Sequence, residues 1–366
     1  MRFTVTREAF LKPLQFTSGV VDRKQTLPVL GNLLLVVSGE RLFVTATDLE
    51  IEMVAHCILQ SGEEGATTVP ARKLLDICRM LPEGAEITFS VAKERATVRS
   101  GKSRFVLSTL PASDFPNQDV VATLAEFQVP QKELKGLLDR TQFAMAQQDV
   151  RYYLNGLLLE ASPKTLRCVA TDGHRLALSE REISIKIKEN QHVIIPRKAV
   201  MELSRLLGEA DSPATVHLGS SHLKIGTEDV SFTTKLIDGR FPDYERVLPQ
   251  ATDKTVVVDR ESLRHALSRI SILSNERYRS VRFQLEPGTL RVSANNPEQE
   301  EAEEEVIVDY SGGALEIGFN ASYVLDALNA LGERDIKLLL SDPNSCCLIK
   351  GQNDDATKYV VMPMRL

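Results

Sequence analysis

The chain has 366 residues, of which 43% are hydrophobic and 26% are charged, and its formal net charge is −6 at pH 7. This composition is typical of a globular protein with a sizeable core, and the length predicts two or three domains. We expect neither a signal peptide nor a membrane-spanning segment, because the densest apolar run, residues 33–37, is far too short.

The first predicted element is a short apolar strand that leads through a polar turn into a helix. It reads FTVTREAFLKPL from Phe3, and the predicted helix, over residues 7–19, has apolar side chains at a spacing of three to four. An alternating segment with turn residues follows, LLLVVSGERLFVTAT, which predicts an antiparallel hairpin. A second strand, turn and helix then reads VPARKLLDICRML from Val69.

Both units recur twice along the chain. The first returns as FQVPQKELKGLL from Phe127 and as VVVDRESLRHAL from Val256, and the second returns as IPRKAVMELSRLL from Ile195 and as FNASYVLDALNAL from Phe319. Hairpins such as VHLGSSHLKIG and VRFQLEPGTLRVSA lie between them. The five later helices are predicted at residues 72–81, 131–145, 197–207, 260–273 and 321–331.

The repeat predicts the fold class. Six similar strand–helix–hairpin units indicate an α+β protein of three repeated domains with sheets and helices in separate layers. We place these domains at residues 1–124, 125–252 and 253–366. Identical joints arranged in an arc close into a ring if a second copy completes the turn, so the repeat makes a ring possible without requiring one.

Positive charge is concentrated in the predicted helices. The six helices carry 14 Lys and Arg against 7 Asp and Glu, a charge of +7, which leaves −13 on the rest of the chain. If the helices share one face, that face attracts phosphates without reading sequence, and the acidic remainder repels nucleic acid. The alternative is that these cations only solvate helix surfaces. The bias in five of the six helices favours the first interpretation.

Two clusters allow an enzymatic interpretation. TDLEIE from Thr47 carries alternating acids that could bind a hard cation, and TDGH from Thr171 alternates an acid with a histidine. The third repeat has NN from Asn295 at the same place, so a turn recurs and a catalytic group does not. The chain has no phosphate-binding Gly loop, HExxH motif or nucleophile elbow. We therefore expect no catalysis, no metal site and no cofactor.

Ordered blocks from the start of the chain to its end carry a family resemblance. They include TLPVLGNLLL, VATDGHRLA, KLIDGRFPDYERVLP, ANNPEQEEAEE and YVVMPMRL, and together they resemble the bacterial DNA polymerase III beta subunits, or beta sliding clamps. The resemblance implies a processivity subunit that encircles duplex DNA without sequence specificity and tethers the replicative polymerase. It also implies a head-to-tail homodimer, with helices inside and sheets outside a ring of DNA clamp domains.

The resemblance assigns three sets of residues. Lys24 stands where the family often has Arg, a change that keeps the attraction to phosphate and loses bidentate geometry. The DNA-binding set is Lys24, Arg72, Arg79, Gln148, Tyr152 and Tyr153, to which the basic helix at 197–207 adds Arg197 and Lys198.

The second set is a partner-peptide groove, in which apolar and Met side chains form a deformable pocket and flanking Arg and His offer hydrogen bonds to an extended peptide. Such a pocket accepts short linear motifs from several partners. The alternative for VVMPMRL is a terminal strand that only packs. The groove residues are Leu154, Thr171, Gly173, His174, Arg175, Leu176, Pro242, Arg246, Val247, Val360, Met362, Pro363, Met364 and Arg365.

The third set is the dimer interface, where opposite charges on the two ends favour head-to-tail closure. The alternative for EQEEAEEE is a solvated acidic face, but the sister repeats lack these acids. The interface residues are Lys73, Arg95, Lys102, Phe105 and Leu107 on the first domain, and Ile272, Leu273, Glu298, Glu300, Glu301 and Glu304 on the third.

The implied partners are duplex DNA, a second copy of the chain, the replicative polymerase alpha subunit, the clamp-loader delta subunit, and other polymerases and repair factors that carry short peptide motifs. Five cysteines without CxxC spacing fit a reduced cytoplasm, where the protein would be associated with the nucleoid through DNA. The competing function is a peptide-binding repeat scaffold that does not encircle DNA.

Overall fold

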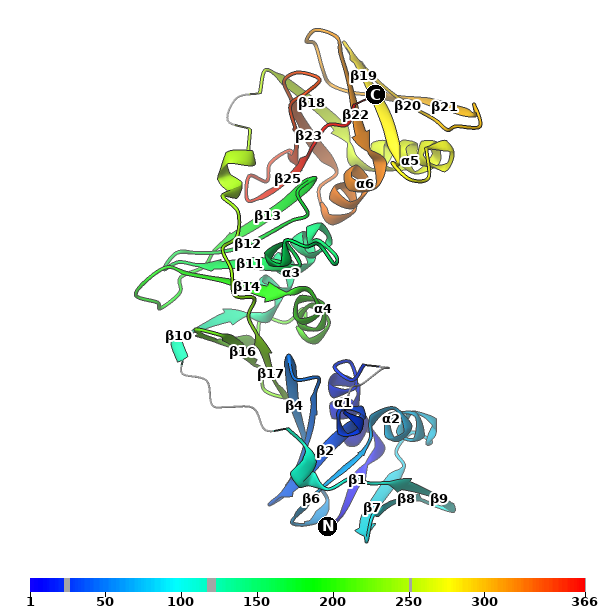
Figure 1. The fold of residues 1–366 in the computed structure, drawn as a ribbon, viewed down its shortest axis with the longest axis vertical. Coiled ribbons are helices and arrows are strands. Elements are labelled where there is room, and N and C mark those ends of the chain that lie inside the picture. The colour runs from blue at the N-terminus through cyan, green and yellow to red at the C-terminus, as the bar shows by residue number, and fades with distance from the viewer. Residues whose placement is uncertain (23–26, 117–122, 250–251, 366) are drawn as a thin grey trace. The chain divides into compact units, whose positions relative to one another are not determined.

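The structure is a computed structural model that describes residues 1–22, 27–116, 123–249 and 252–365 (Figure 1). The chain divides into two compact units, here called unit 1 and unit 2. Unit 1 comprises Met1–Lys132 and Met201–Leu236, and unit 2 comprises Glu133–Val200 and Ile237–Leu366.

All six predicted helices are present. Each of them ends one to four residues earlier than predicted, and the two largest differences arise where the chain leaves α-helical geometry for a tighter turn, as helix ends commonly do. The 3-10 turn η3 (Gln142–Ala144) follows α3, and η6 (Ser271–Leu273) follows α5. The helices are α1 (Arg7–Thr17), α2 (Ala71–Met80), α3 (Gln131–Thr141), α4 (Arg197–Leu206), α5 (Arg260–Ile270) and α6 (Ala321–Ala330).

Side chains at the residue before the helix fix three of these helix starts. The Thr6 hydroxyl accepts a hydrogen bond from Ala9 N, and the Asp259 carboxylate accepts one from Ser262 N at 2.7 Å. Asn320 Oδ1 accepts from the backbone N–H groups of the first turn of α6. Each cap satisfies N–H groups that have no partner inside the helix, which explains why these polar turns recur in the sequence.

Unit 1 contains two antiparallel sheets. The smaller sheet has the strand order β5 (Ser61–Glu63), β1 (Arg2–Thr6), β7 (Glu86–Ala92), β8 (Arg95–Ser100) and β9 (Ser103–Ser108). The larger sheet has the order β10 (Thr123–Pro130), β15 (Pro213–Gly219), β16 (His222–Gly226), β17 (Val230–Lys235), β4 (Ile51–Ile58), β3 (Arg41–Thr47), β2 (Asn32–Ser38) and β6 (Gly65–Pro70). Helix α1 packs on β3 and β4 of this sheet and on α2.

Unit 2 also contains two antiparallel sheets. The larger has the order β14 (Gln191–Pro196), β11 (Gly156–Ala161), β12 (Thr165–Thr171), β13 (Arg175–Glu182), β25 (Thr357–Val361), β24 (Cys347–Gly351), β23 (Asp335–Leu340) and β18 (Lys254–Asp259). The smaller has the order β21 (Glu301–Ile307), β20 (Thr289–Asn295), β19 (Ser280–Glu286) and β22 (Leu315–Asn320). Helix α5 packs on β20 and β21 and on α6.

Each half-repeat has one strand more than the predicted hairpin, so it reads strand, helix and three strands. The third strand pairs outside its own half-repeat: β4 pairs with β17 in unit 1, and β13 pairs with β25 in unit 2. In the described part of the chain, the third strands β9 and β21 each pair on one side and end their sheets. β10 begins at Thr123, two residues before the expected domain junction at 124/125.

The pairings of β4 with β17 and of β13 with β25 are here called joints. In both joints the third strand of the later half-repeat carries a buried aromatic residue at the same place. Phe232 of β17 and Tyr359 of β25 are 0% and 1% exposed. The Tyr359 hydroxyl is buried, and no described residue forms a hydrogen bond with it. A buried polar group without a partner costs free energy, so this hydroxyl reduces the stability of unit 2.

We therefore expect Tyr359→Phe to leave the stability unchanged or to raise it by about 1 kcal/mol, measured as a higher midpoint of thermal unfolding. Tyr310→Phe is the matched control: the Tyr310 hydroxyl donates to Gly313 O at 2.6 Å, so its loss should lower the midpoint. Equal losses in the two variants would show that the Tyr359 hydroxyl contributes a hydrogen bond.

Candidate functional site

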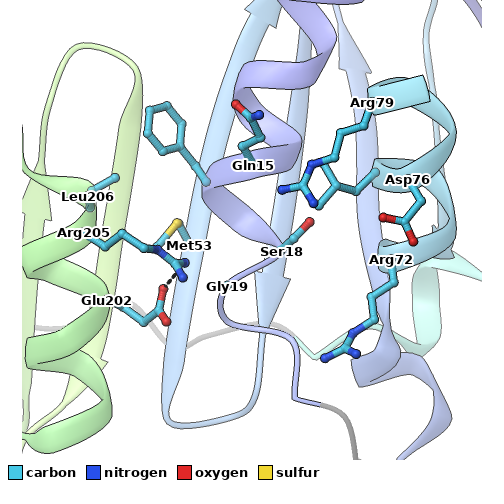
Figure 2. A pocket seen from close by; sticks show the side chains of 12 residues that line it. Gln15, Ser18, Gly19, Met53, Arg72, Asp76, Arg79, Glu202, Arg205 and Leu206 are labelled. Carbon is cyan, nitrogen blue, oxygen red and sulfur yellow. Dashed lines mark hydrogen bonds and ion pairs between the residues drawn. The ribbon is translucent and has the colours of Figure 1, made fainter. Parts of the chain in front are cut away.

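A pocket in unit 1 gathers arginine side chains from two helices (Figure 2). It has a volume of about 620 Å³ and lies between α1, α2 and α4. Arg72 and Arg79, both predicted to bind DNA, extend from exposed positions of α2. Arg205 of α4, which the sequence did not single out, enters from the other side.

Acidic side chains reduce the charge of this pocket. Arg205 Nη2 lies 2.5 Å from Glu202 Oε2, and Asp76 also lines the pocket. Gly19 leaves the room that Arg205 occupies, since a Cβ atom at Gly19 would lie 1.6 Å from Arg205 Nη2. Three arginines against two carboxylates leave a small positive charge, which suits weak attraction of phosphate.

Three further predicted DNA-binding residues lie close together in unit 2. Gln148 is exposed at a positive φ of 56°, and the Tyr152 ring, 56% exposed, packs edge to face against Tyr153 with a centroid distance of 5.7 Å. Asp149 and Arg151 stabilise this loop: Arg151 Nη2 lies 2.9 Å from Asp149 Oδ2, and this hydrogen bond lowers the pKa of Asp149 to about 2. The loop thus presents an exposed aromatic ring and an amide from a fixed backbone.

The remaining DNA-binding predictions are less exposed or lie outside the described residues. Arg197 and Lys198 at the start of α4 are half-buried. Arg197 Nη1 donates to Met145 O at 3.1 Å, so part of this guanidinium holds the chain after η3. Lys24 lies outside the described residues.

The predicted groove residues of unit 2 divide into a buried group and an exposed group. Leu176 and Val360 belong to one apolar cluster with Phe241, Tyr244 and Leu348, against which Tyr153 and Cys346 also pack. The buried group is Leu154, Thr171, Leu176 and Val360; the partly buried group is Arg175, Pro363 and Met364; and the exposed group is Gly173, His174, Pro242, Arg246, Val247, Met362 and Arg365.

Backbone hydrogen bonds hold the C-terminal segment on both sides. β25 pairs with β13, and the pairing continues beyond the strand, where Met362 N donates to His174 O at 2.9 Å. Met364 N donates to Gly318 O of β22 at 2.8 Å. The segment therefore lies as an extended bridge between the two sheets of unit 2, and the exposed Met362 side chain belongs to the residue at its first attachment point.

A polar network anchors the short helix η5 (Tyr244–Val247), which carries two of the exposed groove residues. The Tyr244 hydroxyl donates to Glu160 Oε2 at 2.7 Å and accepts from Arg167 Nη1 at 2.8 Å. Arg167 Nε also donates to Glu180 at 2.8 Å. Burial raises the pKa of Tyr244, so its hydroxyl stays protonated and able to donate. Arg246 and Val247 are consequently presented by a fixed element.

Four of the predicted interface residues lie on the two strands that end a sheet, Phe105 and Leu107 on β9 and Glu301 and Glu304 on β21. Phe105 is half-buried on β9, and Leu107 is only 8% exposed because it already packs in its own domain. Ile272 of η6 is 78% exposed and Leu273 half-buried, while Glu304 of β21 accepts a hydrogen bond from Arg269 Nε at 3.0 Å. Lys73, Arg95, Lys102, Glu298, Glu300 and Glu301 are exposed.

The clusters that allowed an enzymatic interpretation are turns. Asp48 Oδ1 accepts from the backbone N–H groups of residues 50 and 51, and Asp172 Oδ1 accepts from those of residues 174 and 175. In the third repeat Asn296 Oδ1 accepts from Glu300 N at 2.9 Å. Among the described residues, no group of three or more His, Cys, Asp or Glu is placed to hold a metal ion. Nor does any described helix have the length and apolar character needed to cross a membrane.

Sequence reasoning missed side chains whose partners are distant in the chain. Arg167, Tyr244 and Glu160 belong to one network although 84 residues separate its outer members. Arg205 of α4 was also missed, and here the repeat held a usable signal, because α4 has counterparts in the other repeats.

Comparisons with known proteins agree over the whole chain. Family models of the N-terminal, central and C-terminal domains of the DNA polymerase III beta subunit match residues 1–119, 128–243 and 245–365. The beta sliding clamps of Pseudomonas aeruginosa and Escherichia coli K12 are 55% and 53% identical, with 100% of both chains covered in each case. A crystal structure of the Pseudomonas aeruginosa sliding clamp bound to griselimycin has a TM-score of 0.97 and 55% identity, and again 100% of each chain is covered.

Proposed function

The chain belongs to the family of DNA polymerase III beta subunits, the beta sliding clamps, and from this premise we propose how its surfaces work. It is a DNA sliding clamp and not an enzyme. We propose that two copies close head to tail around duplex DNA and slide without reading sequence. The helix arginines supply the attraction, and one groove per chain tethers the polymerase alpha subunit, the loader delta subunit and other factors. We place the protein on DNA in the cytoplasm and keep domain limits at 1–124, 125–252 and 253–366.

The strand pairs inside the chain support a specific joint between copies. β4 and β17 place Met53 opposite Phe232, and β13 and β25 place Ala177 opposite Tyr359. β21 holds the position of β4 and β13 in the third repeat, and β9 holds that of β17 and β25 in the first. Because β9 and β21 end their sheets, each offers unpaired backbone N–H and C=O groups. We propose that β9 of one copy pairs with β21 of the other.

The repeats also propose a register for this joint. Phe105 matches the buried aromatic residues of β17 and β25, and Ala302 matches the residues that face them. In the same antiparallel register exposed Arg104 faces exposed Glu303, an attractive pair that the interface set lacked. The proposed interface keeps Lys73, Arg95, Lys102, Phe105 and Leu107 against Ile272, Leu273, Glu298, Glu300, Glu301 and Glu304.

We propose the groove beside the pairing of β13 with β25, because the equivalent pairing of β4 with β17 is less apolar. Leu176, Val360 and Met362 correspond to Glu52, Thr233 and Lys235 of the joint between β4 and β17. Burial there raises the pKa of Glu52, and Lys235 Nζ lies 3.5 Å from Glu50. An apolar peptide side chain would therefore meet charged groups at the first joint and the apolar cluster at the second. This difference carries the assignment of one groove to each chain.

The DNA-facing set is proposed from exposure and charge. Arg72 and Arg79 line the pocket with Arg205, and Tyr152 and Gln148 are exposed on their loop. Few cations, partly offset by carboxylates, attract phosphates weakly and interchangeably, which suits sliding. We propose Lys24, Arg72, Arg79, Gln148, Tyr152, Tyr153, Arg197 and Lys198 as the DNA-binding set, with Arg205 added.

The dimer proposal predicts a charge-reversal experiment. Arg104→Glu should place two acids opposite each other and raise the dimer dissociation constant about tenfold, as should Glu303→Arg. Mixing the two variants should restore dimerisation, because Glu at position 104 of one variant then faces Arg at position 303 of the other. Sedimentation equilibrium measures the dissociation constants. Arg2→Glu makes the same charge change on β1, inside the sheet, and should leave the constant unchanged. No effect of Arg104→Glu would place the joint elsewhere.

The groove proposal predicts the effect of exchanging one residue between joints. Met362→Lys introduces the residue type that Lys235 supplies in the joint between β4 and β17. It should weaken griselimycin binding about tenfold or more, because the lysine ammonium group would have to lose its hydration against apolar groups. Calorimetry on the dimer measures this. Met201→Lys, at a 52% exposed methionine of α4, is the matched control for Met362, which is 41% exposed. Unchanged affinity in both variants rules the assignment out.

The clamp proposal predicts topological retention. After loading on nicked circular DNA by a bacterial clamp loader, the protein should stay bound when salt is raised, since escape requires opening a joint rather than breaking phosphate contacts. Linearising the circle should release it from the ends. Gel filtration of labelled protein with DNA distinguishes the two. Equal loss from circle and line would falsify encirclement and favour the peptide-binding scaffold.

A further inference from the structure

One guanidinium group in unit 2 is held from five directions. Arg175, the first residue of β13, donates from Nε to Asp172 Oδ2 at 3.2 Å and from Nη2 to Phe143 O at 2.7 Å, and its Nη1 pairs with the Asp326 carboxylate. Its Cζ lies 4.5 Å from the ring centroid of Tyr323 and 5.3 Å from that of Phe143. The side chain is 12% exposed. Each nitrogen of the group therefore donates within the chain.

These contacts join the turn after β12 to a helix of another repeat. Tyr323 and Asp326 belong to α6, and Phe143 belongs to η3. The turn itself carries Gly173 and His174, and the His174 ring stacks at 6.4 Å on Tyr323. His174 O also accepts from Met362 N. A single side chain thus ties the exposed groove residues of the turn to α6.

The sister joints show that the fold of a joint does not need this arginine. Ile51, 1% exposed, stands at the equivalent position of β4, where it faces Thr234 as Arg175 faces Val361. In the third repeat the equivalent is Glu300. Of these three equivalent positions, only the one beside the proposed groove has an arginine, and two carboxylates and two aromatic rings contact its guanidinium group.

We propose that Arg175 is a positioning residue of the peptide groove, which acts by fixing the 171–176 turn against α6 and not by touching the bound peptide. The inference rests on the proposed groove. The planar guanidinium suits this role because it donates to two carboxylates and a carbonyl while it stacks between two rings, whereas an ammonium group offers a point charge. Asp326, whose side chain is 41% exposed on α6, is then needed for binding although it belongs to no groove set.

The test measures griselimycin affinity of the dimer by calorimetry. Asp326→Ala removes an anchor from a helix that tolerates alanine, and we expect about tenfold weaker binding. Arg175→Lys should weaken binding by a similar factor, and the double variant should bind no worse than the weaker single variant, because both break one linkage. Glu133→Gln is the matched control: it breaks the 3.2 Å pair with Arg181, also on β13, and should leave the affinity unchanged.

Each result decides between roles. Arg175 touches the ligand directly, contrary to the proposal, if Arg175→Lys weakens binding while Asp326→Ala does not, or if the two losses multiply. Its role is purely structural if both variants unfold at lower temperature but bind griselimycin normally. Failure of the wild-type chain to bind griselimycin would contradict the proposed groove, and with it the role of Arg175 in that groove.

Discussion

The structure depends on hydrogen bonding between strand edges at the joints of its repeats. An edge strand exposes unpaired N–H and C=O groups, and each half-repeat ends in such a strand. Inside the chain these edges satisfy each other, β4 with β17 and β13 with β25. The pattern leaves one strand of each kind, β9 and β21, at the ends of their sheets. These two strands are the edges that we propose for the joint with another copy.

Because the backbone makes the joint, the side chains at equivalent positions are free to differ. Glu52 and Lys235 make the first joint polar, while Leu176 and Met362 make the second apolar. β21 carries acids, and in the joint that we propose between copies a charge-complementary edge would select its partner. One scaffold therefore supports an internal connection and, as we propose, a partner surface and a dimer contact without any change in strand pairing.

The periodicity of the sequence predicted the helices and turns, which depend on residues close together in the chain. The six helices follow from apolar spacing and from caps such as Thr6 and Asp259, and the recurring Asp or Asn turns follow from the repeat. The third strand of each half-repeat was not predicted. Turns at Asp48 and Asp172 join it to the second strand, but its other partner lies in a different half-repeat, and local pattern does not indicate that pairing. The Arg175–Asp326 pair spans 151 residues and has no counterpart in the sister joints, so periodicity held no signal for it.

The two kinds of surface call for opposite energetics. Sliding requires contacts that are individually weak, and carboxylates such as Glu202 beside Arg205 keep the positive charge of the unit 1 pocket small. Tethering requires a contact that lasts, which apolar burial at fixed positions supplies and salt screens little. Two polar groups hold the surroundings of the proposed groove. The Tyr244 ring belongs to the apolar cluster while its hydroxyl donates to Glu160, and Arg175 donates to Phe143 O. These hydrogen bonds fix the shape of the proposed groove before a partner arrives, so that less ordering entropy opposes the binding of a short peptide.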